Sequence, residues 1–227
     1  MTKKEISGLN KLMQKLASRE VIEKVDSDVS PRLEVVRVGD TLMLNAANTN
    51  YSFGGLHRVF QKVFKKVRMA ERIPEDVLIL GFGAGSIASI LREELEIDCK
   101  IIGVEKDPVV IRLGETYFST DRFKELKIIE ADAAAFMASE KKTFDLIVVD
   151  VYVDFEVPVS CETEEFIGDL ERCLRPGGMV VFNKLVYNHK AGEEATDLIE
   201  IFKSLPGKTK VIKVKETVVN KIVIYET

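Results

Sequence analysis

Residues 77–85 read VLILGFGAG, an aliphatic run that ends in a turn with glycine at alternate positions. A continuous apolar run without alternation indicates a strand covered on both faces, as in a parallel sheet. Glycine lets the chain turn tightly there and approach a ligand, and the following helix start offers N–H donors. A plain strand–helix connection is the simpler alternative. The motif predicts an α/β fold and a candidate ligand-binding turn containing Gly81, Phe82, Gly83 and Gly85.

Strand and helix patterns alternate on the carboxyl side of this turn, which predicts a doubly wound, mostly parallel sheet. Further strands are expected over 99–105, 126–132, 144–150 and 179–185, with a turn at 176–178. The last two runs, 210–216 and 220–226, are joined by a short turn and predict an antiparallel edge. Helices are expected over 86–95, 108–118, 133–139, 161–174 and near 191–204.

The first 55 residues have a different pattern and predict a separate N-terminal subdomain, followed by the main domain over 56–227. Residues 33–46 alternate around Gly39-Asp40, which is typical of a β-hairpin. A further helix is expected over 54–73; its basic face is solvated or, alternatively, binds an anion. An amphipathic helix that docks on the protein, or alternatively lies on a membrane surface, is predicted before the hairpin from Ile6, Leu9, Met13 and Leu16.

Composition narrows the classes of function. The chain has 227 residues and a formal net charge of −4, which argues against broad nucleic-acid binding. No apolar run reaches the roughly 18 residues of a membrane span. The three cysteines have no zinc-type spacing, so we expect reduced thiols, no metal and a cytoplasmic location.

Acidic residues stand at the ends of the next three predicted strands: Glu105, Asp132 and Asp150. In a doubly wound sheet, ligands bind beyond the carboxyl ends of the strands. A carboxylate in the place of Glu105 accepts hydrogen bonds from ribose hydroxyls, and Asp132 can meet an adenine ring. The pattern is GxGxG rather than GxGxxG, and no GxxxxGK[ST] motif is present. These features favour an adenosine-containing ligand without a pyrophosphate.

The runs VLILGFGAG, IIGVEKDP, IIEADAAAF, FDLIVVDVY and LRPGGMVVFN resemble the class I S-adenosylmethionine-dependent methyltransferases. The N-terminal hairpin makes the chain similar, more narrowly, to the spermidine synthase branch of that superfamily. The resemblance covers roughly residues 31–227 and implies a methyltransferase-type, Rossmann-like sheet. It implies S-adenosylmethionine or its decarboxylated form as the cofactor, a small-molecule acceptor and a possible homodimer.

The resemblance also assigns roles to residues. The glycines would pass beneath the methionine portion, and the cofactor site would include Lys106 and, facing adenine, Ala133. Asp150 would stand beside the sulfonium as the catalytic group. His57 falls where synthases carry a histidine, although a helix residue with local hydrogen bonds is an equal alternative. Tyr152 could line the acceptor pocket or be a half-buried loop aromatic.

The chain departs from the synthase pattern at the residues that recognise the polyamine, whereas the residues for the nucleoside are kept. Ala84 replaces the usual acid of the glycine turn, and Asp150 and Asp154 are four residues apart where synthases have three. Asp154 is a candidate substrate residue by the resemblance, but the changed spacing weakens that assignment. Glu156 is an open case, because exposed loop acids are common. We expect a methyltransferase-type enzyme for an unknown small acceptor. The alternatives are an aminopropyltransferase that uses decarboxylated S-adenosylmethionine and an inactive nucleoside-binding module.

Overall fold

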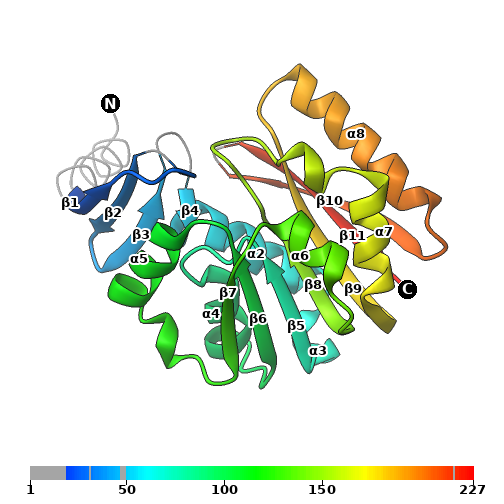
Figure 1. Cartoon of the computed structure of the whole chain (residues 1–227), viewed down its shortest axis with the longest axis horizontal. Helices are drawn as coiled ribbons and strands as arrows, with labels where there is room; N and C mark the ends of the chain where they lie inside the picture. Colours follow the sequence, from blue (N-terminus) through cyan, green and yellow to red (C-terminus); the bar gives the residue numbers. More distant parts are fainter. Residues whose placement is uncertain (1–18, 31, 47–49, 217) are drawn as a thin grey trace, which may run out of the picture.

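The structure is a computed structural model that describes residues 19–30, 32–46, 50–216 and 218–227. Its strands form a four-stranded sheet, in the order β1-β2-β3-β4, and a seven-stranded sheet, in the order β10-β11-β9-β8-β5-β6-β7 (Figure 1). The strands of the small sheet are β1 (Arg19–Val25), β2 (Leu33–Val38), β3 (Thr41–Asn45) and β4 (Asn50–Ser52). The strands of the large sheet are β5 (Asp76–Leu80), β6 (Lys100–Glu105), β7 (Leu126–Glu130), β8 (Phe144–Val149), β9 (Leu174–Val186), β10 (Lys208–Lys215) and β11 (Val219–Glu226).

Helices connect and cover these strands. The α-helices are α2 (Gly54–Lys66), α3 (Met69–Arg72), α4 (Ser86–Ser89), α5 (Pro108–Phe118), α6 (Ala133–Ser139), α7 (Glu164–Arg172) and α8 (His189–Ser204). A π-helical segment (Ile90–Glu94) continues α4, and 3₁₀ turns lie at Thr120–Arg122 and Val159–Cys161. The helix predicted from Ile6, Leu9, Met13 and Leu16 falls outside the described residues.

The predicted fold class is confirmed. Strand β5 pairs in parallel with β6 on one side and with β8 on the other, so the strand order reverses between β5 and β8. The predicted C-terminal edge is antiparallel, because β11 pairs antiparallel with both β9 and β10. Ligands in such sheets bind at the reversal point, beyond the carboxyl ends of the strands. The residues that follow β5 and β8 are therefore expected to line a ligand site.

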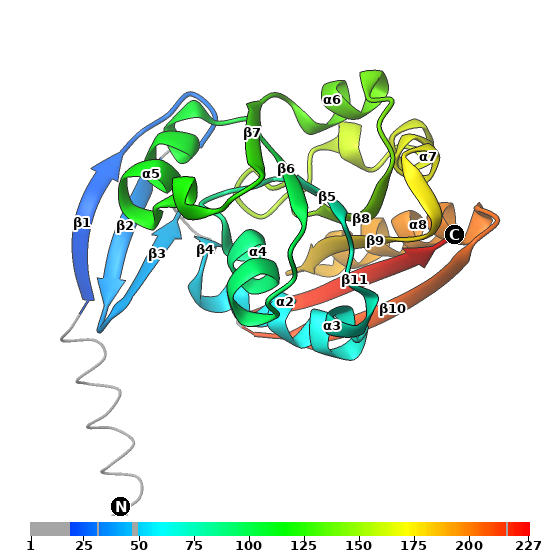
Figure 2. The ribbon, with the colours of Figure 1, turned by 90° about the horizontal axis from the view of Figure 1, so that it is seen from below.

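The large sheet lies between two apolar layers, because successive strand residues point to opposite faces. On one face, Val77 and Ile79 pack with side chains of α2 and α4. On the other, Leu78 and Leu80 pack with side chains of α6, α7 and α8. Figure 2 shows α2 and α4 on the side of the sheet opposite α6 and α7. This two-sided burial explains the unbroken apolar runs of the central strands.

The N-terminal sheet is larger than predicted. The expected hairpin is present as β2 and β3, with Val38 opposite Thr41. Residues 19–25, which the sequence analysis left outside the hairpin, form strand β1 and pair antiparallel with β2. This sheet packs on α5, where Leu33 and Leu44 join Leu113 in one buried cluster (Figure 2). The small sheet is therefore a wall beside the carboxyl edge of the large one.

Three predicted elements differ in detail. The helix expected over 54–73 divides into α2 and α3, because Arg68 adopts a left-handed conformation with φ of 56°. The helix expected over 86–95 is α-helical for only its first turn and then π-helical. The expected turn at 176–178 belongs to the start of β9, where the register with β8 shifts between Phe144 and Leu146.

Candidate functional site

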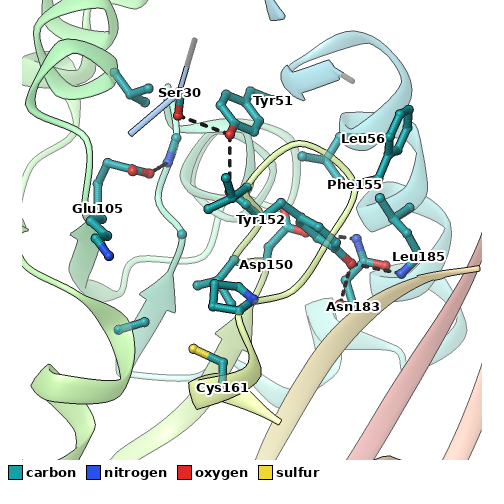
Figure 3. Close-up of a pocket in the computed structure, with 18 of the residues that line it drawn as sticks. Ser30, Tyr51, Leu56, Glu105, Asp150, Tyr152, Phe155, Cys161, Asn183 and Leu185 are labelled. Carbon is teal, nitrogen blue, oxygen red and sulfur yellow. Dashed lines mark hydrogen bonds between the residues drawn. The ribbon is translucent and has the colours of Figure 1, made fainter. Parts of the chain in front are cut away.

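A cavity of about 240 Å³ lies beyond the carboxyl ends of β5, β6 and β8 and reaches under the small sheet (Figure 3). One part of its wall is made of strand-end residues from the large sheet, and another part comes from β4, α2 and the chain after β8. The wall residues predicted from the sequence are Gly81, Gly83, Glu105, Lys106, Asp132, Ala133, Asp150 and Tyr152.

The glycine turn has no unused backbone donor from Gly81 to Gly85. Gly81 and Phe82 both donate to the carbonyl of Val104, at 2.9 and 3.0 Å. Gly83 donates to Glu105 Oε2 at 2.9 Å, and Ala84 donates to Ser52 Oγ at 2.8 Å. Gly85 donates to the carbonyl of Phe82 at 3.2 Å. The N–H groups of Gly81 to Gly85 are thus occupied within the protein and are not free for a phosphate, whereas the helix start that was expected to supply donors begins at Ser86.

At two positions of the turn, neighbouring atoms lie too close for any residue other than glycine. A Cβ on Gly81 would lie 2.2 Å from the carbonyl oxygen of Asp150. A Cβ on Gly83 would lie 2.5 Å from Ser52 Oγ, the group that binds Ala84. Both glycines have positive φ, 79° and 58°, which a residue with a side chain rarely adopts. The motif therefore joins β5, β8 and the small sheet at the cavity.

Glu105, at the end of β6, is held by two backbone N–H groups. Its Oε2 accepts from Gly83, and its Oε1 accepts from Asp107 at 3.1 Å. Burial raises the pKa of Glu105 from its ordinary value, while those hydrogen bonds act in the opposite direction. A carboxylate has about four acceptor positions, so the fixed oxygens retain capacity for ligand hydroxyl groups.

Asp132, after β7, caps helix α6. Its Oδ1 accepts from Ala134 and Ala135 at 3.0 and 3.2 Å, and its Oδ2 contacts Lys106 Nζ at 3.1 Å. Partial burial raises the pKa of Asp132, but the hydrogen bond from Ala135 and the Lys106 ammonium outweigh it and leave the pKa lowered. Asp132 is therefore held as an anion with a cation beside it at this end of the cavity.

Asp150 and Asn183 form a buried polar pair in the cavity wall. Asn183 Nδ2 donates to Asp150 Oδ1 at 2.9 Å, and the two residues are 0% and 8% exposed. Burial raises the pKa of Asp150 to about 7, with the nearby charge of Glu105 acting in the same direction and Asn183 lowering it. A carboxyl group with this pKa can both accept and release a proton near neutral pH.

Tyrosines from two separate segments meet beside this pair. Tyr152 donates to the carbonyl of Asn183 at 2.6 Å and accepts from Leu185 N–H at 3.0 Å. Tyr51, on β4, donates to the carbonyl of Tyr152 at 3.2 Å, and Ser30 Oγ lies 3.2 Å from the Tyr51 hydroxyl (Figure 3). These bonds fix the loop after β8 against both the large sheet and the small sheet.

Several predicted site residues lie outside the cavity wall. Phe82 packs under the turn against Gly103, and Gly85 faces the rings of Phe82 and Phe123. His57 stacks on Phe53 and its Nε2 lies 2.5 Å from Glu94 Oε1, which agrees with the alternative of a helix residue with local hydrogen bonds.

The two loop acids after Asp150 also lie outside the wall. Asp154 has a left-handed φ of 58° and does not line the cavity. Glu156 is exposed, and its Oε1 accepts from the Tyr187 hydroxyl at 3.1 Å. Among the described wall residues, Asp150 is therefore the acid that this loop contributes.

The sequence analysis missed wall residues from other segments. Asn183 lies in a predicted strand, but its position beside Asp150 depends on the pairing of β8 with β9, which has no local signal. Tyr51 had no local signal, because β4 has only three residues. The other missed wall residues are Val29, Ser30, Asn50, Gly55, Leu56, Val59, Val104, Val110, Ala131, Val151, Val153, Phe155, Pro158, Cys161, Leu185, Glu216, Val218 and Asn220.

The described residues offer no metal site and no membrane-spanning helix. Within the described ranges, no group of three or more His, Cys, Asp or Glu side chains could hold a metal ion. The helices in that part of the chain are all too short or too polar to cross a bilayer. The wall thiol of Cys161 is buried, and burial raises its pKa to about 11, so it is a poor nucleophile at neutral pH.

Comparison with known proteins gives a family match over most of the chain. A family model described as "Methyltransferase domain" matches residues 75–221. A probable polyamine aminopropyl transferase of Bifidobacterium longum is 33% identical over 106 residues, which is 47% of this chain and 23% of that protein. The chain spans between 23% and 50% of the length of the first three curated relatives that it matches.

Solved structures share the fold at low sequence identity. The spermidine synthase of Thermotoga maritima has a TM-score of 0.70 and 20% identity, over 91% of this chain and 72% of that one. Human methyltransferase-like protein 13, solved in complex with SAH, has a TM-score of 0.62 and 20% identity, over 76% and 82% of the two chains. These likenesses show the fold.

Proposed function

This chain belongs to the methyltransferase-domain family, and from that premise we propose that it is an S-adenosylmethionine-dependent transferase of spermidine synthase-like architecture. Its proposed reaction is the transfer of a methyl group to a small-molecule acceptor. The proposed cofactor residues are Gly81, Gly83, Glu105, Asp132 and Asp150, with Lys106 and Ala133 beside them.

The observation that carries this proposal is the donor and acceptor set of the cavity. Because every N–H from Gly81 to Gly85 is bonded within the protein, a pyrophosphate finds no free backbone donor in these five residues. Carboxylates at three strand ends instead suit hydroxyl and amine donors and a positively charged sulfonium. An S-adenosyl compound has these groups and no phosphate, so the residues present fit it.

The protein's part in the reaction is to bind, orient and exchange a proton. When bound, S-adenosylmethionine supplies a sulfonium carbon whose bond to sulfur breaks as the acceptor's lone pair forms the new bond. In this proposal Glu105 holds the ribose hydroxyls and Asp150 lies beside the acceptor. Asp150 accepts the proton that a nitrogen acceptor loses, and the buried wall excludes water around the reacting groups.

Aminopropyl transfer from decarboxylated S-adenosylmethionine is the second candidate, because the names of several curated relatives point to it. It requires acids for both ends of a diamine. The positions of Asp154 and Glu156 outside the cavity wall argue against it. An inactive nucleoside-binding module is the third candidate.

Calorimetry with S-adenosylmethionine, its decarboxylated form, methylthioadenosine and NAD⁺ tests these candidates. We expect S-adenosylmethionine to bind most tightly and NAD⁺ not to bind. Preference for the decarboxylated form would favour aminopropyl transfer, and NAD⁺ binding would contradict the assignment of the glycine turn. Binding of the adenosyl ligands without turnover on any acceptor would support the module.

Three further properties belong to this proposal. Residues 1–55 would form an N-terminal subdomain and residues 56–227 the cofactor-binding domain. A cytoplasmic location is proposed, and the three cysteines support it because all are free thiols and buried. A homodimer is proposed from the resemblance to the synthases, and size measurement by light scattering tests it.

A further inference from the structure

The side-chain oxygen of Asn183 is a buried acceptor without a donor. Its Nδ2 is used by Asp150, but its Oδ1 has no hydrogen-bond partner in the described part of the chain. Asn183 is 0% exposed and lines the cavity. An unsatisfied buried polar atom costs about 1–3 kcal/mol, and this one, unlike the orphan atoms of His57 and Thr120, belongs to a residue of the cavity wall. This oxygen therefore marks a place where a ligand donor belongs.

The identity of Asp150 determines which donor fits. An ionised carboxylate accepts hydrogen bonds and does not donate them, so Asn183 must turn its NH₂ toward Asp150 and leave its oxygen free. The pair then presents carboxylate oxygen and amide oxygen together. An amine or ammonium group has several N–H donors on one nitrogen and can satisfy both acceptors, whereas a hydroxyl has only one.

We propose that Asn183 and Asp150 together bind the nitrogen of a primary monoamine acceptor whose remaining part is uncharged and apolar. The inference rests on the proposed transferase function and names its substrate class. Burial lowers the pKa of an ammonium and raises that of a carboxyl group, so the proton can pass from the nitrogen to Asp150 before transfer. The nitrogen lone pair is then free to form the new bond.

The distribution of acids in the wall disfavours a second ammonium. Glu105 and Asp132 stand at the ends of β6 and β7, in the part proposed for the nucleoside. The other wall carboxylate is Glu216, whose Oε2 accepts from Arg58 Nε at 3.0 Å and whose Oε1 contacts Lys62. These two cations lower the pKa of Glu216 and compensate its charge. A diamine would have to break this ion pair to place its distal nitrogen.

Much of the remaining wall is apolar, although the uncharged polar residues Asn50 and Asn220 also line it. Side chains from three separate segments contribute the carbon surface. They are Leu56 and Val59 on α2, Tyr152, Val153 and Phe155 after β8, and Leu185 and Val218 in and beside the C-terminal strands. Burial of an apolar group against these side chains contributes binding energy of about 25 cal/mol per Å².

The test is calorimetry at pH 8 with 2-phenylethylamine and putrescine as probes. S-adenosylhomocysteine is titrated first, because its binding tests the proposed function separately. Each amine is then titrated into protein saturated with S-adenosylhomocysteine and into the ligand-free protein. We expect phenylethylamine to bind at least about tenfold more tightly than putrescine, which corresponds to about 1.4 kcal/mol.

Two substitutions separate the acceptor role from a structural one. Asn183→Leu removes the oxygen, and we expect a loss of about tenfold or more in phenylethylamine affinity, with S-adenosylhomocysteine affinity changed by less than about twofold. Asn183→Asp keeps an oxygen at the position, and we expect affinity for the amine to be retained. Asn188→Leu is the control, because Asn188 is an exposed amide that caps α8 and lies outside the wall.

The amine titrations test the acceptor site, and the S-adenosylhomocysteine titration tests the transferase function. Tighter binding of putrescine, or equal phenylethylamine affinity in wild type and Asn183→Leu, overturns the inference while leaving the transferase proposal intact. Absence of S-adenosylhomocysteine binding contradicts the transferase proposal, and the ligand-free titrations still report on the amine site.

Discussion

Asp150 and Asn183 lie side by side because the residues before them, Val149 and Phe182, are paired in parallel strands β8 and β9. The register brings the Asn183 amide to 2.9 Å from the Asp150 carboxylate at the edge of the sheet. Burial and the charge of Glu105 therefore raise the pKa of the Asp150 carboxyl group, and the hydrogen bond from Asn183 lowers it. The pH dependence of activity and of stability follows from this shift in the pKa of Asp150.

Activity is expected to rise with pH through a midpoint near 7, because Asp150 must be ionised to accept a proton. Asn183→Leu should move the midpoint upward, since the hydrogen bond from Asn183 lowers the pKa of Asp150. Asp150→Asn should reduce kcat by about 10²–10⁴-fold. The dependence of kcat/KM on pH in the three proteins checks this; a profile that does not change between pH 6 and 8 in wild type would contradict it.

Stability should increase when the carboxyl group of Asp150 is removed. Its folded-state pKa of about 7 lies above the ordinary 3.8, so the folded protein holds a proton that the unfolded chain has released. The free energy of unfolding therefore falls as pH rises from about 4 to about 7, by up to about 4 kcal/mol. Asp150→Asn avoids this loss and should be more stable than wild type at pH 8, with a smaller gain at pH 5.

Urea unfolding of wild type and Asp150→Asn at both pH values measures this gain. Asp121→Asn, at an exposed position, is the control for removing one carboxylate and should show no such dependence. A lower stability of Asp150→Asn at pH 8 would mean that the charged group is not penalised by burial.

Gly81→Ala should destabilise the protein far more than Gly177→Ala. The two glycines have almost the same φ, 79° and 78°, so the backbone strain is matched. A Cβ at Gly81 would lie 2.2 Å from the carbonyl oxygen of Asp150, whereas a Cβ at Gly177 would meet no atom within 4 Å. We expect about 1 kcal/mol for the loss at Gly177 and several kcal/mol at Gly81. Thermal unfolding compares them, and equal losses would show that contact with β8 is unimportant.

The central sheet and its strand-end residues could be predicted from sequence because each signal is local. An unbroken apolar run marks a strand that is buried on both faces, and chain order alone puts Gly81, Glu105, Asp132 and Asp150 at one edge. The register of β8 and β9 is not local, so the contact between Asp150 and Asn183 was not predicted.

The N-terminal part and the acceptor side were harder to predict for the same reason. Tyr51 is held at the cavity by Tyr152 and Ser30, and the adjacent Ser52 accepts from the glycine turn, all contacts between residues far apart in sequence. His57 was predicted as a substrate residue by resemblance, but its side chain faces Glu94. Residues 57 and 61 lie on the same side of α2, and both contact the Glu94 carboxylate. The core stripe of α2 at Val59 and Val63 determines this orientation.

The most direct test of the central claim, that the strand-end acids bind an adenosyl group, is calorimetric titration of S-adenosylmethionine into wild type and Glu105→Ala. Glu130→Ala is the matched control, because Glu130 ends the neighbouring strand β7 but is exposed and outside the cavity wall. We predict that Glu105→Ala weakens binding by about tenfold or more through the lost ribose acceptors, while Glu130→Ala binds like wild type. Unchanged affinity in Glu105→Ala, in a protein that still folds, would contradict the assignment of the site.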